Sequence, residues 1–338
     1  MDSQTEIIRI TSVYFEDELD YQKLSNASKE FKSILNVICG QDMDIEEGRK
    51  DIEHENGKAL GTFWAALCLD DLIRTRQFIR GIDKAIKDKR NKKPIHILYA
   101  GTGPFATLIL PFIFRYQKED IKYTLLEVNP FTFQILQNVI SKLGLKELDI
   151  NLINDDATKF QIDSKNKPDI IISETMQNAL AKEQQVPIFL NLMRQVNLDT
   201  IFIPEKIELH LGLKKAGIPS EELQIKHFNK VEKVFEVSKE SMFPQKQSEK
   251  QSIIKNSFTK RKTVIESKDL KGFNQLVIIT EIQVYKNEKI VINESGLTTP
   301  LIIQEIPKNI KDPIIIDTQY QISSEPKLEY KITLPSNA

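Results

Sequence analysis

The sequence predicts an α/β protein followed by a strand-rich region: a helical N-terminal segment, a parallel sheet, and a C-terminal barrel-like or sandwich-like domain. Between residues 95 and 204, short apolar runs alternate with helical patterns, which is typical of βαβ units and therefore of a parallel sheet. After residue 205, strand-like segments follow one another without helices between them. We expect three regions, at 1–58, 59–204 and 205–338.

The individual elements follow from the spacing of apolar residues. One buried helix face is expected from the spacing of Leu60, Trp64, Leu67, Cys68, Leu72, Ile79 and Ile82. The parallel strands are expected at 95–100, 123–128, 150–153, 169–173 and 200–203, with a helix at 129–143. The later strands are expected at 275–285, 289–293, 300–306, 313–322 and 328–334. The polar stretch 238–262 is expected to be an exposed loop.

The charge balance and the cysteine count exclude several classes of protein. With 47 basic against 48 acidic residues, the chain lacks the excess positive charge typical of proteins that bind nucleic acid or anionic membranes. No apolar run approaches the ~20 residues of a membrane span, and the first residues do not resemble a secretory signal. Cys39 and Cys68 have no zinc-ligand spacing, so we expect no metal and a cytoplasmic location.

A glycine-containing loop follows the first parallel strand. Gly101, Thr102 and Gly103 stand where a strand turns into a helix, and glycine lets the backbone approach a ligand closely because it has no Cβ. By itself this is weak evidence for a cofactor, since glycines also end strands for structural reasons.

Carboxylates at the ends of the next two strands strengthen the case. Glu127 is placed to accept the two hydroxyls of a ribose, which S-adenosylmethionine (SAM) and NAD both carry, although capping of the next helix would also explain it. After the third strand, Asp155 and Asp156 offer a carboxylate that can accept a hydrogen bond from an adenine amine, with neighbouring apolar residues such as Ala157 to pack on the ring. The series favours a cofactor that contains adenosine.

The fourth strand ends at a pair of glutamates. Glu174 follows the strand directly and Glu183 lies nine positions later. Two carboxylates in one pocket would repel each other, so a cation with several donors is their natural occupant. A planar guanidinium fits, because one carboxylate can hold it bidentately while the other orients it.

Together these motifs resemble the protein arginine N-methyltransferases, over roughly residues 60–208. The most specific part is the double-glutamate loop, Ser173-Glu174-Thr175-Met176 followed by Glu183. The resemblance implies a Rossmann-like SAM-binding domain joined to a β-barrel, and a helix segment, Asp71 to Thr75, that closes over the cofactor. We would otherwise read Asp71 and Arg74 as a surface ion pair.

The resemblance also implies roles for single residues. Arg74 would bind the methionine carboxylate of SAM, Glu127 its ribose and Asp156 its adenine, while Glu174 and Glu183 would hold the guanidinium. Asp71 would belong to the same catalytic group.

The sequence departs from the family in three places. Position 99, where related methyltransferases usually have an acidic residue, is Tyr99. The aromatic segment expected shortly before Arg74 is missing. The family's Thr-His-Trp motif is also absent, so Asp71 lacks its expected histidine partner. Related enzymes pair through a helical insertion in the barrel, which makes 215–237 a candidate dimerisation arm and a homodimer a candidate state.

The leading hypothesis is therefore a SAM-dependent methyltransferase acting on a guanidino or related cationic nitrogen. Because the barrel motifs are absent and the charge is balanced, free arginine or another small metabolite is favoured over arginine in a protein. Two other classes stay open: an NAD-dependent oxidoreductase, which leaves the paired glutamates unexplained, and a catalytically inactive subunit of the same fold.

Overall fold

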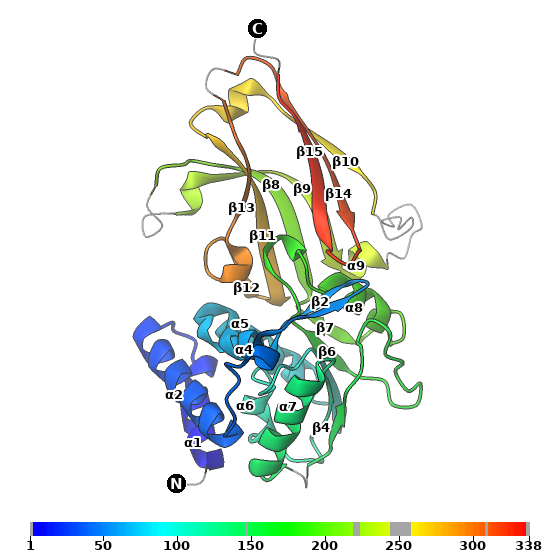
Figure 1. Cartoon of the computed structure of the whole chain (residues 1–338). Coiled ribbons are helices and arrows are strands. Elements are labelled where there is room, and N and C mark those ends of the chain that lie inside the picture. The colour runs from blue at the N-terminus through cyan, green and yellow to red at the C-terminus, as the bar shows by residue number, and fades with distance from the viewer. Residues whose placement is uncertain (1–2, 146–147, 219–223, 244–257, 308–309, 336–338) are drawn as a thin grey trace.

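The structure is a computed structural model, and it describes residues 3–145, 148–218, 224–243, 258–307 and 310–335. N-terminal helices and a parallel sheet form one half of the elongated molecule, and antiparallel strands form the other (Figure 1). The helices are α1 (Ser3–Thr11), α2 (Tyr21–Cys39), α3 (Glu46–Arg49), α4 (Thr62–Leu67), α5 (Leu72–Lys89), α6 (Leu110–Ile113), α7 (Pro130–Lys142), α8 (Gln185–Met193) and α9 (Lys239–Met242).

A five-stranded parallel sheet carries the predicted βαβ units. Its order is β5 (Ile150–Ile153), β4 (Ile121–Leu126), β3 (Ile95–Ala100), β6 (Ile170–Ser173) and β7 (Ile201–Ile203). All six residues of β3 are buried, as expected for a central strand covered on both faces. The chain reverses its direction of winding at β3, and open α/β sheets bind ligands at such a point, beyond the carboxyl ends of the strands.

The C-terminal half consists of two antiparallel sheets. One contains β12 (Glu288–Ile290), β11 (Gln275–Tyr285), β8 (Lys206–Lys214) and β9 (Phe228–Ser238), with β13 (Leu301–Glu305) also paired to β11. The other contains β10 (Arg261–Ile265), β14 (Ile314–Gln321) and β15 (Lys327–Thr333). Aromatic side chains join the two sheets: the rings of Phe235 and Tyr320 stack at 4.2 Å, and Phe258 meets both edge-on.

The predicted fold class is confirmed, and most predicted strands match within two residues. The prediction of one continuous helix face was wrong at its start. Asp71 accepts a hydrogen bond from the Arg74 N–H and so caps a new helix, α5, leaving α4 and a short 3-10 turn (Cys68–Asp70) before it. Trp64, expected in the buried face, is 41% exposed.

Two other predicted segments are partly outside the described residues. Within 238–262 the structure has α9 and the first residues of β10, and 244–257 are not described. In the candidate dimerisation arm, β9 pairs with β8 from Phe228 to Ser238, so this part is a sheet strand and not the helical insertion expected. Residues 219–223 are not described. The homodimer stays a prediction.

A hairpin of β1 (Ile52–His54) and β2 (Gly57–Ala59) precedes the parallel sheet. Its second strand crosses the first expected boundary, between residues 58 and 59, and the division into three regions stays a prediction. Among the described residues, no helix is long and apolar enough to span a membrane.

A buried carboxylate fastens α5 to the C-terminal half. Glu288, on β12, is 6% exposed and pairs with Arg80 and Lys84 of α5. Burial raises the pKa of Glu288, but the hydrogen bonds and charges of Lys84 and Arg80 outweigh it and hold the pKa below its usual value. Because α5 also carries Arg74, this contact helps to fix the position of a residue that is predicted to bind the cofactor.

We predict that Glu288→Gln lowers the free energy of unfolding by about 2 kcal/mol at neutral pH, since it removes a charge-assisted bond from two cations. A carboxylate with a lowered pKa stabilises the fold above its unfolded pKa and loses this effect as the pH falls. The wild type and the variant should therefore converge in acid. Chemical denaturation at pH 7 and pH 4 measures both effects, and an equal difference at the two values would contradict them.

Candidate functional site

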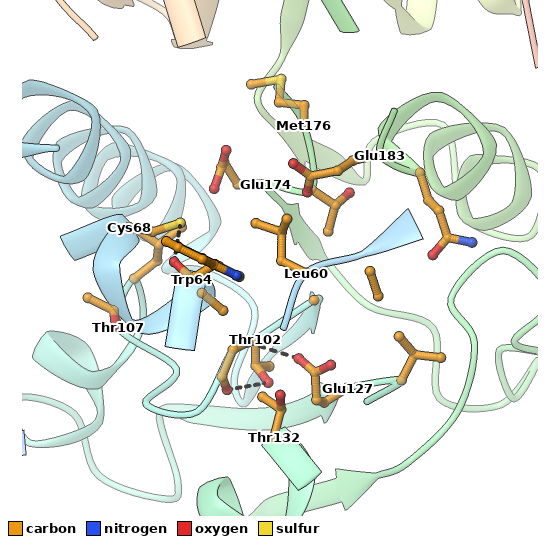
Figure 2. A pocket seen from close by; sticks show the side chains of 18 of the residues that line it. Leu60, Trp64, Cys68, Thr102, Thr107, Glu127, Thr132, Glu174, Met176 and Glu183 are labelled. Carbon is orange, nitrogen blue, oxygen red and sulfur yellow. Dashed lines mark hydrogen bonds between the residues drawn. The ribbon is translucent and has the colours of Figure 1, made fainter. Parts of the chain in front are cut away.

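A cavity of about 360 Å³ lies beyond the carboxyl ends of β3, β4 and β6. Its size falls within the range of small-molecule sites. Its walls come from the parallel sheet, from the β2–α5 segment and from Gly296 and Leu297 of the C-terminal half. Figure 2 shows Glu174 and Glu183 on one side of this cavity and Thr102 and Glu127 on the other.

The glycine loop and Glu127 form one end of the cavity. Gly101 has a φ of +74°, and a Cβ there would lie 2.4 Å from the Thr175 side chain, so only glycine fits. The Gly103 N–H donates to Glu127 Oε2 at 2.9 Å, and the Asn129 N–H donates to Oε1 at 2.9 Å. Burial raises the pKa of Glu127, and these N–H groups oppose that rise.

Helix capping, the structural alternative for Glu127, is carried out by its neighbour. Asn129 is the N-cap of α7 and accepts from the Phe131 and Thr132 N–H groups. Glu127 is buried, accepts a hydrogen bond from the glycine loop and lines the cavity. Thr102 and Gly103 line it with Glu127.

After β5, the cavity is lined by the neighbour of Asp156, the residue that was predicted to bind adenine. Asp155 and Ala157 line it, whereas Asp156 does not. Asp156 Oδ1 instead accepts from the Thr158 N–H at 2.8 Å and from the Thr158 hydroxyl at 2.7 Å, which holds the side chain in a local turn.

Both glutamates of the predicted pair line the cavity. Glu174 forms an ion pair with Arg74, and both side chains are almost completely buried. Arg74 also donates from Nη1 to the Cys68 carbonyl at 2.8 Å, while its Nε is buried without a partner among the described residues. The guanidinium therefore keeps a buried donor, the Nε–H, for a further acceptor.

Glu183 is 6% exposed. Burial raises its pKa to about 7, although Arg74, Gln177 and Lys58 act to lower it. The carboxyl group therefore changes its charge near neutral pH, which makes the charge of the cavity sensitive to pH.

Asp71 has partners that the sequence analysis did not find. Its Oδ2 accepts from the Ser295 hydroxyl at 2.6 Å and from the Gly296 N–H at 3.0 Å. Both donors come from the loop between β12 and β13. Asp71 joins the start of α5 to the C-terminal half.

The lining also includes Lys58, Trp64 and Gln184, which were not predicted as site residues. Lys58 brings a cation, and Trp64 brings an indole at a partly exposed position. Gln184 is buried, and its Nε2 has no partner among the described residues. Its position directly after Glu183 was the only signal that could have identified it.

One group of potential metal ligands lies elsewhere, on β8 and β11. The ligand atoms of Glu208, His210 and Glu281 lie within 4.8 Å of one another. Both carboxylates already pair with lysines, Glu208 with Lys233 at 3.0 Å and Glu281 with Lys230 at 2.9 Å. Lys233 and Lys230 therefore already balance the negative charges of Glu208 and Glu281.

Comparison with known proteins gives a family match over the region of the cavity. The family model for PRMT5 arginine-N-methyltransferase matches residues 70–202. The crystal structure of PRMT6 aligns with a TM-score of 0.52 at 10% identity, covering 78% of this chain and 97% of that chain, which shows a common fold. No protein of curated function matches the sequence.

Two other solved structures align with lower scores. One is the Trypanosoma brucei PRMT1 enzyme-prozyme heterotetrameric complex with AdoHcy, with a TM-score of 0.47, 12% identity and coverage of 78% of this chain and 96% of that chain. The other is Arabidopsis thaliana protein arginine methyltransferase 10, with a TM-score of 0.47, 12% identity and coverage of 77% and 91%.

The raised pKa of Glu183 predicts a pH-dependent effect on stability. Between its ordinary pKa of 4.5 and about 7, the folded protein keeps a proton that the unfolded chain releases, so rising pH destabilises the wild type. Glu183→Gln cannot ionise. The variant should gain stability over the wild type as the pH rises from 5 to 8, by roughly 3 kcal/mol at most.

Thermal or chemical unfolding across this pH range measures the effect. Glu119→Gln, at an exposed position, is the matched control and should run parallel to the wild type. A constant difference between Glu183→Gln and the wild type would contradict the prediction.

Proposed function

Starting from a chain with the fold of the protein arginine methyltransferases, we propose that it is a SAM-dependent N-methyltransferase for the guanidino group of arginine. One observation carries the proposal: Glu174 and Glu183 line the same buried cavity as the glycine loop, with Arg74 beside them. The two carboxylates form a receptor for a cation next to a site that fits a nucleoside cofactor.

The residues of the cavity fit SAM. The unused Nε of Arg74 is a buried donor for the methionine carboxylate, and Glu127 offers carboxylate oxygens to the ribose hydroxyls. Asp155 lines the cavity and would accept a hydrogen bond from the adenine amine; Asp156 would have to leave its turn with Thr158 to serve instead. When bound, SAM supplies an electrophilic methyl group on a positively charged sulfonium.

The glutamates attract and orient the acceptor. Glu174 is fixed at the end of a sheet strand, so a guanidinium bound to it is held in a defined direction, and alignment of reactants alone lowers a barrier substantially. With a pKa of about 7, Glu183 is suited to take the proton that the guanidinium loses when its nitrogen is methylated.

Arginine within a protein is the acceptor we propose. The sequence favoured a small metabolite because the Thr-His-Trp motif is absent. The family match supports a protein substrate instead. Asp71 also has Ser295 and Gly296 as hydrogen-bond partners, so it does not need the missing histidine to hold its position.

A catalytically inactive, cofactor-binding subunit is the second candidate. One observation favours it: Glu174 already pairs with Arg74, so a guanidinium acceptor would have to compete for that carboxylate. Turnover by the isolated protein separates the two candidates.

The direct test is incubation with methyl-labelled SAM and a set of acceptors: arginine-containing peptides, free arginine, and lysine-containing peptides. Mass spectrometry should find the label on peptide arginine. SAM should also stabilise the protein in a thermal shift assay, whereas NAD should not. Stabilisation by SAM without transfer to any acceptor would favour the inactive subunit.

We predict that Glu174→Gln reduces methyl transfer at least 100-fold, because the neutral amide cannot hold the guanidinium as a carboxylate does. SAM affinity, measured by calorimetry, should change only a few-fold. Glu281→Gln, outside the cavity, serves as the control and should keep full activity. Normal turnover of Glu174→Gln would refute the guanidinium site.

Arg74→Lys should weaken SAM binding about tenfold or more, since lysine keeps the charge but lacks the planar fork that engages a carboxylate. Calorimetric titration with SAM measures this. Affinity equal to that of the wild type would mean that Arg74 serves Glu174 alone.

A further inference from the structure

The loop that carries the two glutamates has an unusual backbone. Ala179, Leu180 and Lys182 have φ angles of +55°, +53° and +68°, the left-handed region that residues with a Cβ rarely adopt. Three such residues within four positions persist only where surrounding contacts hold them. The backbone conformation of the segment between Glu174 and Glu183 therefore depends on its contacts with neighbouring elements.

Three contacts that hold this segment come from the C-terminal half, in addition to the Lys58 N–H of β2, which donates to the Lys182 carbonyl at 2.9 Å. The Ala179 N–H donates to the Thr280 hydroxyl at 2.9 Å, and the Tyr320 hydroxyl donates to the Leu180 carbonyl at 2.7 Å. The Lys182 N–H donates to the Pro326 carbonyl at 2.7 Å. Each left-handed residue thus has one hydrogen bond to a strand, or to the turn between two strands, of the other half of the molecule.

The two side chains among these anchors are themselves rigid. Thr280 on β11 and Tyr320 on β14 are each 1% exposed. The Tyr320 ring is stacked on Phe235, with 4° between the ring planes. Burial raises the pKa of Tyr320 far above neutral, so its hydroxyl stays a donor.

We propose that Thr280 and Tyr320 are positioning residues that hold the Glu174–Glu183 loop in the shape in which both carboxylates face the cavity. The inference rests on the proposed function, because it assigns to the C-terminal sheets the task of setting the guanidinium site. Neither side chain lines the cavity, so both act only through the loop.

The cofactor end of the cavity is built separately. Gly103 and Glu127 lie in the loops that follow β3 and β4, and neither contacts Thr280 or Tyr320 through a hydrogen bond. Loss of an anchor should therefore impair acceptor binding and turnover while leaving SAM binding unchanged. General destabilisation of the fold would instead reduce SAM binding and turnover together.

The test uses Tyr320→Phe and Thr280→Val, which keep the shape of each side chain and remove one hydrogen bond. Tyr123→Phe is the matched control: Tyr123 is a buried tyrosine on β4 whose hydroxyl has no partner in the described part of the chain. For each protein we measure kcat and KM with an arginine peptide, the Kd for SAM, and hydrogen exchange of the segment 174–183.

Both anchor variants should lose at least tenfold in kcat/KM, bind SAM within twofold of the wild type, and exchange faster at 174–183. Tyr123→Phe should match the wild type in all three. Unchanged kinetics or unchanged exchange in the anchor variants would overturn the proposal, as would an equal loss of SAM affinity.

Failure of the proposed function gives a different result. If the wild type methylates no arginine acceptor, the kinetic comparison cannot be made. Hydrogen exchange then decides whether Thr280 and Tyr320 hold the loop. Faster exchange at 174–183 then supports the anchoring, and unchanged exchange refutes it.

Discussion

The buried ion pair between Arg74 and Glu174 joins the proposed cofactor end of the site to the proposed acceptor end. It joins the first turn of α5 to the end of β6 inside the cavity. A buried pair stabilises a protein only where further bonds compensate the loss of hydration. The structure supplies such bonds to Arg74 through the Cys68 carbonyl, and it fixes the start of α5 through Asp71 and its Ser295 and Gly296 partners.

The charges of the cavity explain what it can receive. The side chains of Glu127, Glu174 and Glu183 are almost completely buried, and the cations among the lining residues are Arg74 and Lys58. Burial raises the pKa values of Glu127 and Glu183 because water no longer stabilises their charged forms. A cationic ligand reverses this effect. The cavity is therefore best matched by positively charged groups, which both a sulfonium and a guanidinium provide.

The sequence predicted the parallel sheet and both glutamates because these depend on local spacing: β3 and β5 match their predicted runs residue for residue. It did not identify Ser295 as a partner of Asp71, since the two residues are 224 positions apart and only the tertiary fold brings them together. The resemblance assigned the adenine to Asp156, whereas Asp155 lines the cavity, because a loop's composition does not show which side chain turns toward a cavity. The hydrogen bonds from Thr280 and Tyr320 to the glutamate loop could not be predicted either, because they also join residues that are far apart in the sequence.

In the site we propose, Arg74 binds the cofactor, and Glu174 and Glu183 bind the arginine acceptor. A crystal structure of the protein with S-adenosylhomocysteine and an arginine peptide tests it most directly. We expect Arg74 to contact the carboxylate of the bound nucleoside, with the peptide guanidinium between Glu174 and Glu183. A complex in which the nucleoside fills the cavity while the guanidinium lies outside it would contradict the account.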